Sequence, residues 1–230
     1  MDKLFCENIA EYLALEKEAL NILRSSKYVQ EGCSKTNLQS VFSQSMGEKF
    51  STVKLYFQFR SSVFDSRSHE VSLGCYFLCD SNVLKQASYS VEICRTSERE
   101  GVSTKNVVSR MHFDYASRAE PNACQHPVFH IQMWGKLPQY LRDEGVKYEN
   151  EENSAISYPR MPFAPLSLAL FLNMTIKELG SDNLRKLLKM PAWDELIKRH
   201  ERKILAPFFD KLKGCLVAGN HLSKFYYAER

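Results

Sequence analysis

Residues 110 to 132, RMHFDYASRAEPNACQHPVFHIQ, hold three of the six histidines of this 230-residue chain, together with an aspartate. Two imidazoles with a pKa near neutrality, a carboxylate that orients one of them and a cation that holds an anion are the parts of a metal-free acid–base phosphodiesterase. In this interpretation His112 and His130 are the acid and the base, and Asp114 orients one imidazole.

A divalent metal ion is an alternative cofactor for the same stretch. Mixed nitrogen and oxygen ligands would hold the ion, which would activate a water molecule. The candidate ligands are His112, Asp114, His126 and His130. Their spacing, H-x-D-(x11)-H-(x3)-H, matches no zinc motif that we can derive. A structural role also stays open, because a His-x-Asp pair on a sheet face commonly bonds to a neighbouring backbone group.

Two strands must position these residues, because the sequence on both sides of the stretch alternates with a period of two. VVSRMHFDY puts apolar side chains on one face, namely Val107, Met111, Phe113 and Tyr115, and polar ones on the other, namely Arg110, His112 and Asp114. HPVFHIQMW likewise separates Phe129, Ile131 and Met133 from Val128, His130 and Gln132. Residues 116 to 125 have the composition of a hairpin loop, so we expect antiparallel neighbours.

It follows from this pairing that one sheet face gathers an acid, two bases, a cation and an amide. The members are Arg110, His112, Asp114, His130 and Gln132. Arg110 and Gln132 are then candidate substrate contacts. In YPRMPFAPLSLALF, Arg160 precedes a buried helix in a stiff proline-rich turn, where its guanidinium could grip a phosphate or a carboxylate at two points. Pairing of Arg160 with a surface acid is the alternative.

The excess positive charge of the chain lies near its C-terminus. Between Arg185 and Lys213 there are nine Lys or Arg residues and four Asp or Glu residues. On AWDELIKRHERKIL the apolar side carries Trp193, Leu196, Ile197, His200 and Ile204, and the basic side carries Lys198, Arg199, Arg202 and Lys203. Lys198, Arg199 and Arg202 are candidate phosphate contacts, although a solvated helix face has the same pattern. We expect His200 to be a satisfied core histidine.

The rest of the chain predicts a single α+β domain over residues 1–230. Residues 1–50 form a helical segment, with an amphipathic helix at 2–24 and a short helix around Asn37 to Gln44. Residues 51–135 form an antiparallel sheet of about five strands. Residues 159–230 form a helical group on the sheet, which includes a core helix at 166–179 that ends at Gly180.

Composition excludes several classes of protein. The net charge of +4 allows a nucleic-acid partner without requiring one. Seven cysteines without a C-x-x-C pair indicate reduced thiols, and hence a cytoplasmic protein. We expect no signal peptide and no membrane span, because the longest apolar stretch is too short. No P-loop, G-x-G-x-x-G or G-x-S-x-G motif occurs. His69 and His221 are expected at the surface.

Three motifs occur in a fixed order between Arg110 and Phe171: Asp114-Tyr115, H-P-x-x-H at 126–130, and Arg-x-Pro-x-x-Pro at 160–165, before an apolar helix. This order resembles a family of uncharacterised bacterial proteins that carry a domain of unknown function and occur in mobile-element and phage-defence loci. The chain departs from the family pattern in that a glycine, Gly135, comes only after Met133 and Trp134. The resemblance implies a genomic context and carries no assigned chemistry.

Two functions of different class remain open. The first is a nucleic-acid-cleaving hydrolase that acts as a toxin or a phage-defence effector, by analogy with small histidine-rich toxin nucleases. The second is a non-catalytic subunit of a defence or mobile-element complex. Such a subunit would use the polar sheet face or the basic helix to bind nucleic acid or a protein encoded nearby.

Overall fold

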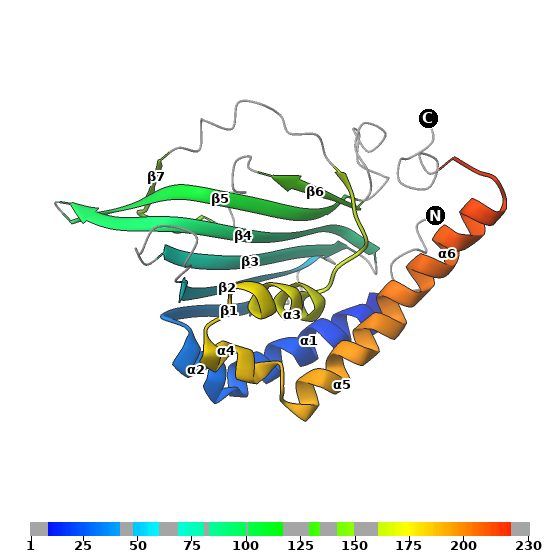
Figure 1. The fold of residues 1–230 in the computed structure, drawn as a ribbon, viewed down its shortest axis with the longest axis horizontal. Helices are drawn as coiled ribbons and strands as arrows, with labels where there is room; N and C mark the ends of the chain where they lie inside the picture. Colours follow the sequence, from blue (N-terminus) through cyan, green and yellow to red (C-terminus); the bar gives the residue numbers. More distant parts are fainter. Residues whose placement is uncertain are drawn as a thin grey trace.

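The computed structural model describes residues 9–41, 48–59, 69–80, 83–99, 101–116, 129–133, 142–149 and 161–221. In these residues the chain forms an α+β fold, in which helices from both ends of the chain pack on one face of a largely antiparallel sheet (Figure 1). The predicted fold class is therefore confirmed.

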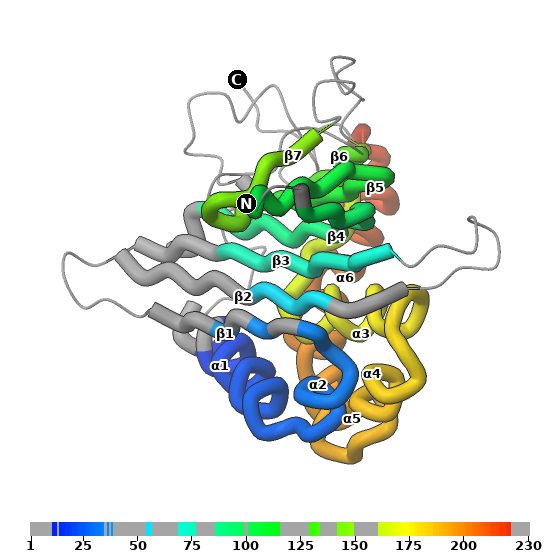
Figure 2. The backbone as a smooth tube through the Cα atoms, turned by 90° about the vertical axis from the view of Figure 1, so that its left-hand side faces the viewer, coloured from blue at the N-terminus to red at the C-terminus, as the bar shows by residue number. Residues whose placement is uncertain are grey.

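The sheet is a meander, since its first six strands lie side by side in chain order (Figure 2). These strands are β1 Lys35–Val41, β2 Glu48–Phe59, β3 His69–Asp80, β4 Val83–Arg99, β5 Val102–Ala116 and β6 Phe129–Met133. Two short strands complete it: β8 Met161–Pro162 pairs with β6, and β7 Lys147–Glu149 pairs in parallel with β5. The five predicted strands are all present among these.

The strand β1 corrects the short helix predicted around Asn37 to Gln44. Its residues from Lys35 to Val41 pair with Tyr56 to Phe50 of β2, whereas residues 42–44 lie outside the described part of the chain. Ser, Gln and Asn give this segment no clear period. Pairing with the long neighbouring strand, rather than its own pattern, determines its conformation.

A β-bulge in β5 corrects the position predicted for Val107. Ile93 of β4 pairs with Ser109, but the next residue, Cys94, pairs with Val107, so Val108 is the extra residue. One extra residue moves every preceding side chain of β5 to the opposite face. Val107 and Lys105 therefore share the face of Arg110 rather than that of Phe113.

The helices form one layer. Their bounds are α1 Ile9–Ser25, α2 Lys27–Gly32, α3 Leu168–Leu179, α4 Asp182–Leu187, α5 Pro191–His200, η4 Glu201–Leu205 and α6 Ala206–Val217. Gly180 ends α3 as predicted. The π-helical turn η4 joins α5 to α6 because Pro207 has no N–H for a regular helical bond and its ring would clash with the carbonyl of Lys203.

The core lies between this helical layer and the apolar face of the sheet. Tyr89 and Phe113 of the sheet contact Phe171 of α3 with ring centroids 5.4 and 6.0 Å apart. Cys75 is part of this core. It is a free thiol, as are Cys33, Cys94 and Cys215. Among the described residues, no helix is both long and apolar enough to cross a bilayer.

Candidate active site

The pairing of β5 with β6 brings the predicted polar cluster together. Asp114 lies opposite His130, and His112 lies opposite Gln132. The intervening residue Phe113 points into the core, so the polar residues face away from the helices. The predictions that these strands are antiparallel neighbours and that Arg110, His112, Asp114, His130 and Gln132 share one face are confirmed.

The Asp114 carboxylate lies between a histidine and a serine. Oδ2 of Asp114 is 3.7 Å from Nε2 of His130, and Ser88 of β4 donates a hydrogen bond from Oγ to Oδ1 at 2.6 Å. The Asp114 side chain is 28% exposed, whereas His130 is 6% exposed. The serine fixes the carboxylate, and the carboxylate is close enough to stabilise a protonated imidazole.

A small cavity lies on the core side of this pair. Its volume is only about 10 Å³, enough for about one water molecule. Most of its wall consists of residues that face the core, among them Tyr89, Phe113, Phe163 and Leu166, so Asp114 and His130 border it from the other face of their strands. Ligand sites are clefts of about 300–1,000 Å³, so this cavity is too small to be one.

Two further residues of the predicted cluster are buried. His112 lies beneath the surface next to Asp114 along the strand. Arg110 is 1% exposed, and its guanidinium forms a two-point ion pair with Glu92 of β4, with Nε 2.8 Å from Oε2. The burial and the ion pair weaken the prediction that Arg110 contacts a substrate, which stays a prediction.

Arg160 and His126 lie outside the described residues. Met161, the residue after Arg160, pairs with Ile131, so the chain enters β8 beside the strand that carries His130. No group of three His, Cys, Asp or Glu side chains in the described ranges is arranged to hold a metal ion. The four-ligand alternative includes His126 and stays a prediction.

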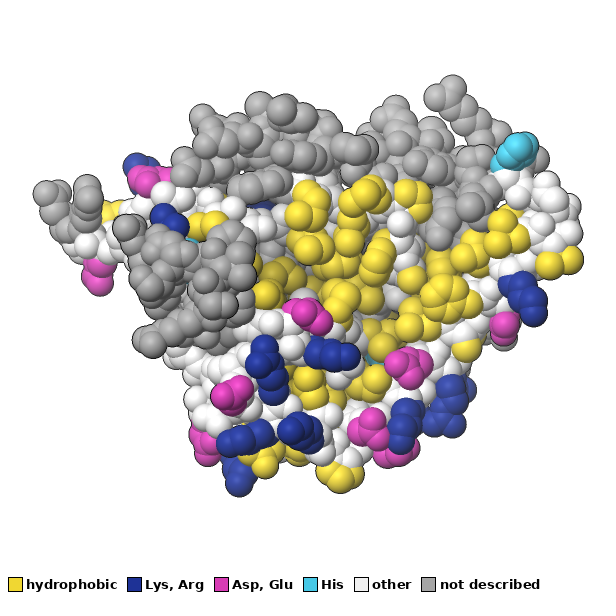
Figure 3. All heavy atoms as spheres, in the orientation of Figure 1, with side chains coloured by type: hydrophobic (Ala, Val, Ile, Leu, Met, Phe, Trp, Pro, Cys, Tyr) yellow, Lys and Arg dark blue, Asp and Glu magenta, His cyan; other side chains and the backbone are white. Residues whose placement is uncertain are grey.

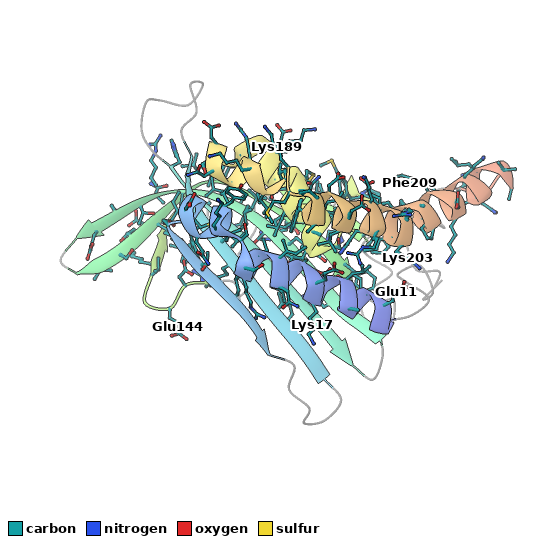
Figure 4. The ribbon with its side chains drawn as sticks, turned by 90° about the horizontal axis from the view of Figure 1, so that it is seen from below. Glu11, Lys17, Glu144, Lys189, Lys203 and Phe209 are labelled. Carbon is teal, nitrogen blue, oxygen red and sulfur yellow. The ribbon has the colours of Figure 1, made fainter. Side chains whose placement is uncertain are left out.

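The basic helix face is occupied by internal ion pairs. Lys198 contacts Asp194 at 2.7 Å and Glu195 at 3.0 Å, and Arg199 pairs with Glu18. Lys203 contacts Glu11 of α1 at 2.8 Å (Figure 4). Nε of Arg202 donates to the carbonyl of Lys198 at 3.1 Å. These contacts favour a solvated helix face, and they weaken the prediction that Lys198, Arg199 and Arg202 bind a substrate.

For the three described histidines outside the cluster, the predicted burial is right at two positions and wrong at one. His200 is buried, as predicted, and its Nδ1 is hydrogen-bonded to Ser167 at 2.5 Å, but its Nε2 has no hydrogen-bond partner among the described residues. His221 is exposed, as expected. His69, however, is buried rather than at the surface, and Arg95 donates to its Nε2 at 3.3 Å.

A second polar cluster on the same sheet face was not predicted from the sequence. Asp143, in the loop before β7, accepts hydrogen bonds from Tyr56, from Lys54 at 3.2 Å and from Lys105 at 2.9 Å. Burial opposes ionisation of Asp143, but the hydrogen bonds from Tyr56 and Lys105 outweigh it and lower the pKa of the carboxyl to about 2. The alternation of β2 could have indicated Lys54 and Tyr56, because both fall on its polar face.

A buried polar network joins the helices to the sheet at the start of α3. The Glu16 carboxylate accepts from the backbone N–H of Leu168 at 3.1 Å, and Ser167 caps the same helix end. The hydroxyls of Tyr12 and Tyr89 are hydrogen-bonded at 2.9 Å. Burial raises the pKa of Glu16 to about 7, and it lowers the pKa of His200 to about 4.

Comparisons of the chain with protein-family models, with curated proteins and with solved structures found no match.

Proposed function

We propose that this protein is a nucleic-acid-cleaving hydrolase whose reaction centre is the Asp114–His130 pair. The observation that supports this proposal is the pair itself: a carboxylate held by Ser88 lies 3.7 Å from an imidazole on the polar face of the sheet. The Asp114 side chain is 28% exposed, so a substrate has access to the carboxylate. In this proposal the protein acts as a toxin or a phage-defence effector.

His130 is the general base in this mechanism. It takes a proton from the attacking hydroxyl or water, and Asp114 stabilises the imidazolium that forms. His112 returns a proton to the leaving oxygen from its place beside Asp114. Gln132, opposite His112, and Arg160 hold the phosphate. Arg110 has no role in contacting the substrate, because it is paired with Glu92.

The test is incubation of the protein with labelled single-stranded RNA and DNA, with and without EDTA. We expect His130→Ala and Asp114→Asn to lower the cleavage rate by about 100-fold or more, the range of general acid–base catalysis. His221→Ala, which removes an exposed histidine far along the chain, is the matched control. Resistance to EDTA supports acid–base chemistry, and sensitivity supports the metal alternative. Absence of cleavage, or cleavage that survives His130→Ala, argues against the proposal.

A second candidate function, a non-catalytic subunit, is favoured by the surface of α6. This helix projects beyond the sheet (Figure 1), and hydrophobic side chains gather along it and over the middle of the same face (Figure 3). Phe209 is 52% exposed and Val217 is 80% exposed. Exposed apolar patches commonly mark protein interfaces. Co-expression with proteins encoded nearby would test this, with Phe209→Ser expected to break any complex and Lys211→Ser to preserve it.

A further inference from the structure

Four side chains from three strands converge on one carboxylate. Lys54 and Tyr56 come from β2, Lys105 comes from β5 and Tyr148 comes from β7. Lys54 Nζ lies 3.2 Å from Oδ1 of Asp143, and Lys105 Nζ lies 2.9 Å from Oδ2. The Tyr56 hydroxyl donates to Oδ1, and the Tyr148 hydroxyl donates to Oδ2 at 3.4 Å. Both carboxylate oxygens are therefore surrounded by donors.

The two lysines are kept on the sheet face at a cost in solvation. Their side chains are only 8% and 5% exposed. Removal of an ammonium group from water costs several kcal/mol, and well-packed apolar residues often replace a buried ion pair without loss of stability. Apolar contacts could thus hold the loop on this face at a smaller cost in solvation free energy. The donors are better explained by anion binding than by packing.

The charges around Asp143 favour an anion of the size and charge of phosphate. Among the described residues, Lys54 and Lys105 form the ion pairs to Asp143, and Lys105 also contacts Glu70 at 2.7 Å. Without the Asp143 carboxylate, these two lysines would have Glu70 as their acidic partner in the described ranges, which leaves an excess of one positive charge. The Arg142 guanidinium lies 4.8 Å from the centroid of the Tyr148 ring, and hence beside the cluster. Lysine and arginine are the usual phosphate-binding side chains in proteins.

The donors and the carboxylate belong to different kinds of structure. Lys54, Tyr56 and Lys105 lie on long paired strands, whereas Asp143 begins a turn in which Val146 N–H donates to its carbonyl at 3.4 Å. Gly145 has a φ of +72° in this turn, a conformation that glycine adopts without strain. The backbone of the turn also contacts two of the donors: Lys54 Nζ donates to the Arg142 carbonyl at 2.9 Å, and the Asp143 N–H donates to the Tyr148 hydroxyl at 3.1 Å. A phosphate group that replaces the carboxylate must therefore compete with these contacts as well.

We propose that Lys54, Tyr56, Lys105 and Tyr148 form a binding site for a phosphate group, and that Asp143 fills this site as an internal ligand. This phosphate site is separate from the proposed hydrolase centre, and the inference does not depend on hydrolase activity. Two strands, β3 and β4, separate Lys54 from His112 in the sheet, which corresponds to about 14 Å at the spacing of neighbouring strands. The two sites are therefore distinct parts of one face.

The experiment is calorimetric titration of inorganic phosphate into the full chain and its variants. We expect Asp143→Ala to bind phosphate at least tenfold more tightly than the unmodified protein. Glu144→Ala is the matched control, because Glu144 is an exposed carboxylate in the same turn that points away from the sheet (Figure 4). We expect it to leave the affinity unchanged. Addition of Lys105→Met to Asp143→Ala should remove the gain.

Asp143→Asn is the second variant, in case the alanine variant does not fold, and near-ultraviolet circular dichroism reports folding. A dinucleotide titrated in parallel separates a site for phosphodiesters, which binds both probes, from a site for free phosphate. The proposal is overturned if folded Asp143→Ala binds phosphate no better than the unmodified protein, or if Glu144→Ala produces the same gain. It is also overturned if neither Asp143 variant folds, because Asp143 is then a structural anchor.

Discussion

At the scale of single residues, the buried ion pair of Arg110 and Glu92 has a structural role on the polar face of the sheet. The two residues lie opposite each other on β5 and β4, and both are buried. A buried ion pair is strongly destabilised when one partner is removed, because the remaining charge stays without compensation. Replacement of both partners by apolar residues of similar size does much less harm.

We expect Arg110→Ala to lower the free energy of unfolding by about 3–5 kcal/mol, because Glu92 keeps its buried charge. The double variant Arg110→Met with Glu92→Leu should recover most of this loss. Urea denaturation of Arg110→Ala, of the double variant and of the unmodified protein measures the difference. A double variant as unstable as Arg110→Ala would contradict the view that the pair acts only as a compensated charge.

Glu16 gives the second residue-scale prediction, since its folded-state pKa of about 7 exceeds its usual value of 4.5. Its contribution to stability is fully present below pH 4.5 and is lost as the pH rises through 7. The rise in pKa corresponds to about 3 kcal/mol. Glu16→Gln keeps an oxygen for the Leu168 N–H but does not ionise. We expect it to match the unmodified protein at pH 4 and to be more stable by up to about 3 kcal/mol at pH 9.

Denaturation at several pH values checks this difference. His200 acts in the opposite direction: its pKa is lowered from 6.5 to about 4, so its contribution is lost as the pH falls between these values. Because His200 is present in both proteins, its effect cancels in the comparison. Equal stability of the two proteins at pH 9 would mean that the Glu16 carboxylate is compensated in the folded state.

At the scale of elements, the strands that alternate strictly could be predicted and the others could not. The period of two in β5 and β6 predicted their faces, and the hairpin loop predicted their antiparallel pairing. The strand β1 was not predicted, because its sequence is polar and its extended conformation depends on pairing with β2. The bulge at Val108 could not be predicted, because one extra residue does not produce a recognisable change in the hydrophobic pattern.

The same limit applies to the site. Asp114 and His130 were predicted because both lie on strands with a clear period. Asp143 was not predicted, because it lies in a loop 89 residues from Lys54, and no local pattern reports a contact over that distance. The burial of Arg110 also could not be read from its own strand, since it depends on Glu92 of the neighbouring one.

The cap of α3 gives a prediction for an element. Ser167 accepts from the Leu170 N–H at 3.3 Å and is hydrogen-bonded to the buried His200. Ser181 caps α4 through the Leu184 N–H at the same distance of 3.3 Å, in a less buried place. We expect Ser181→Ala to cost about 1 kcal/mol and Ser167→Ala to cost about 2 kcal/mol or more. Thermal denaturation of the two variants compares them, and equal losses would show that the His200 contact contributes nothing.

At the scale of the whole molecule, the two faces of the sheet have different tasks. One face is apolar and holds the helical layer through a single cluster of buried residues drawn from both ends of the chain. The other face carries the Asp114–His130 pair, the Arg110–Glu92 pair and the Asp143 cluster. The helical layer therefore stabilises the sheet from its apolar face, whereas most of the charged and polar groups on the other face are themselves buried and paired.

A shared core predicts that the helices and the sheet unfold together. Trp193 of α5 is buried in that core, and its Nε1 donates to Asn173 of α3 at 3.2 Å, so its fluorescence reports the helical layer. In a Trp134→Phe variant, whose only tryptophan is Trp193, we expect the fluorescence and the far-ultraviolet circular dichroism to change at the same temperature. Two separate midpoints would mean that the helical layer can leave the sheet, and residues 1–230 would then behave as two folding units rather than one.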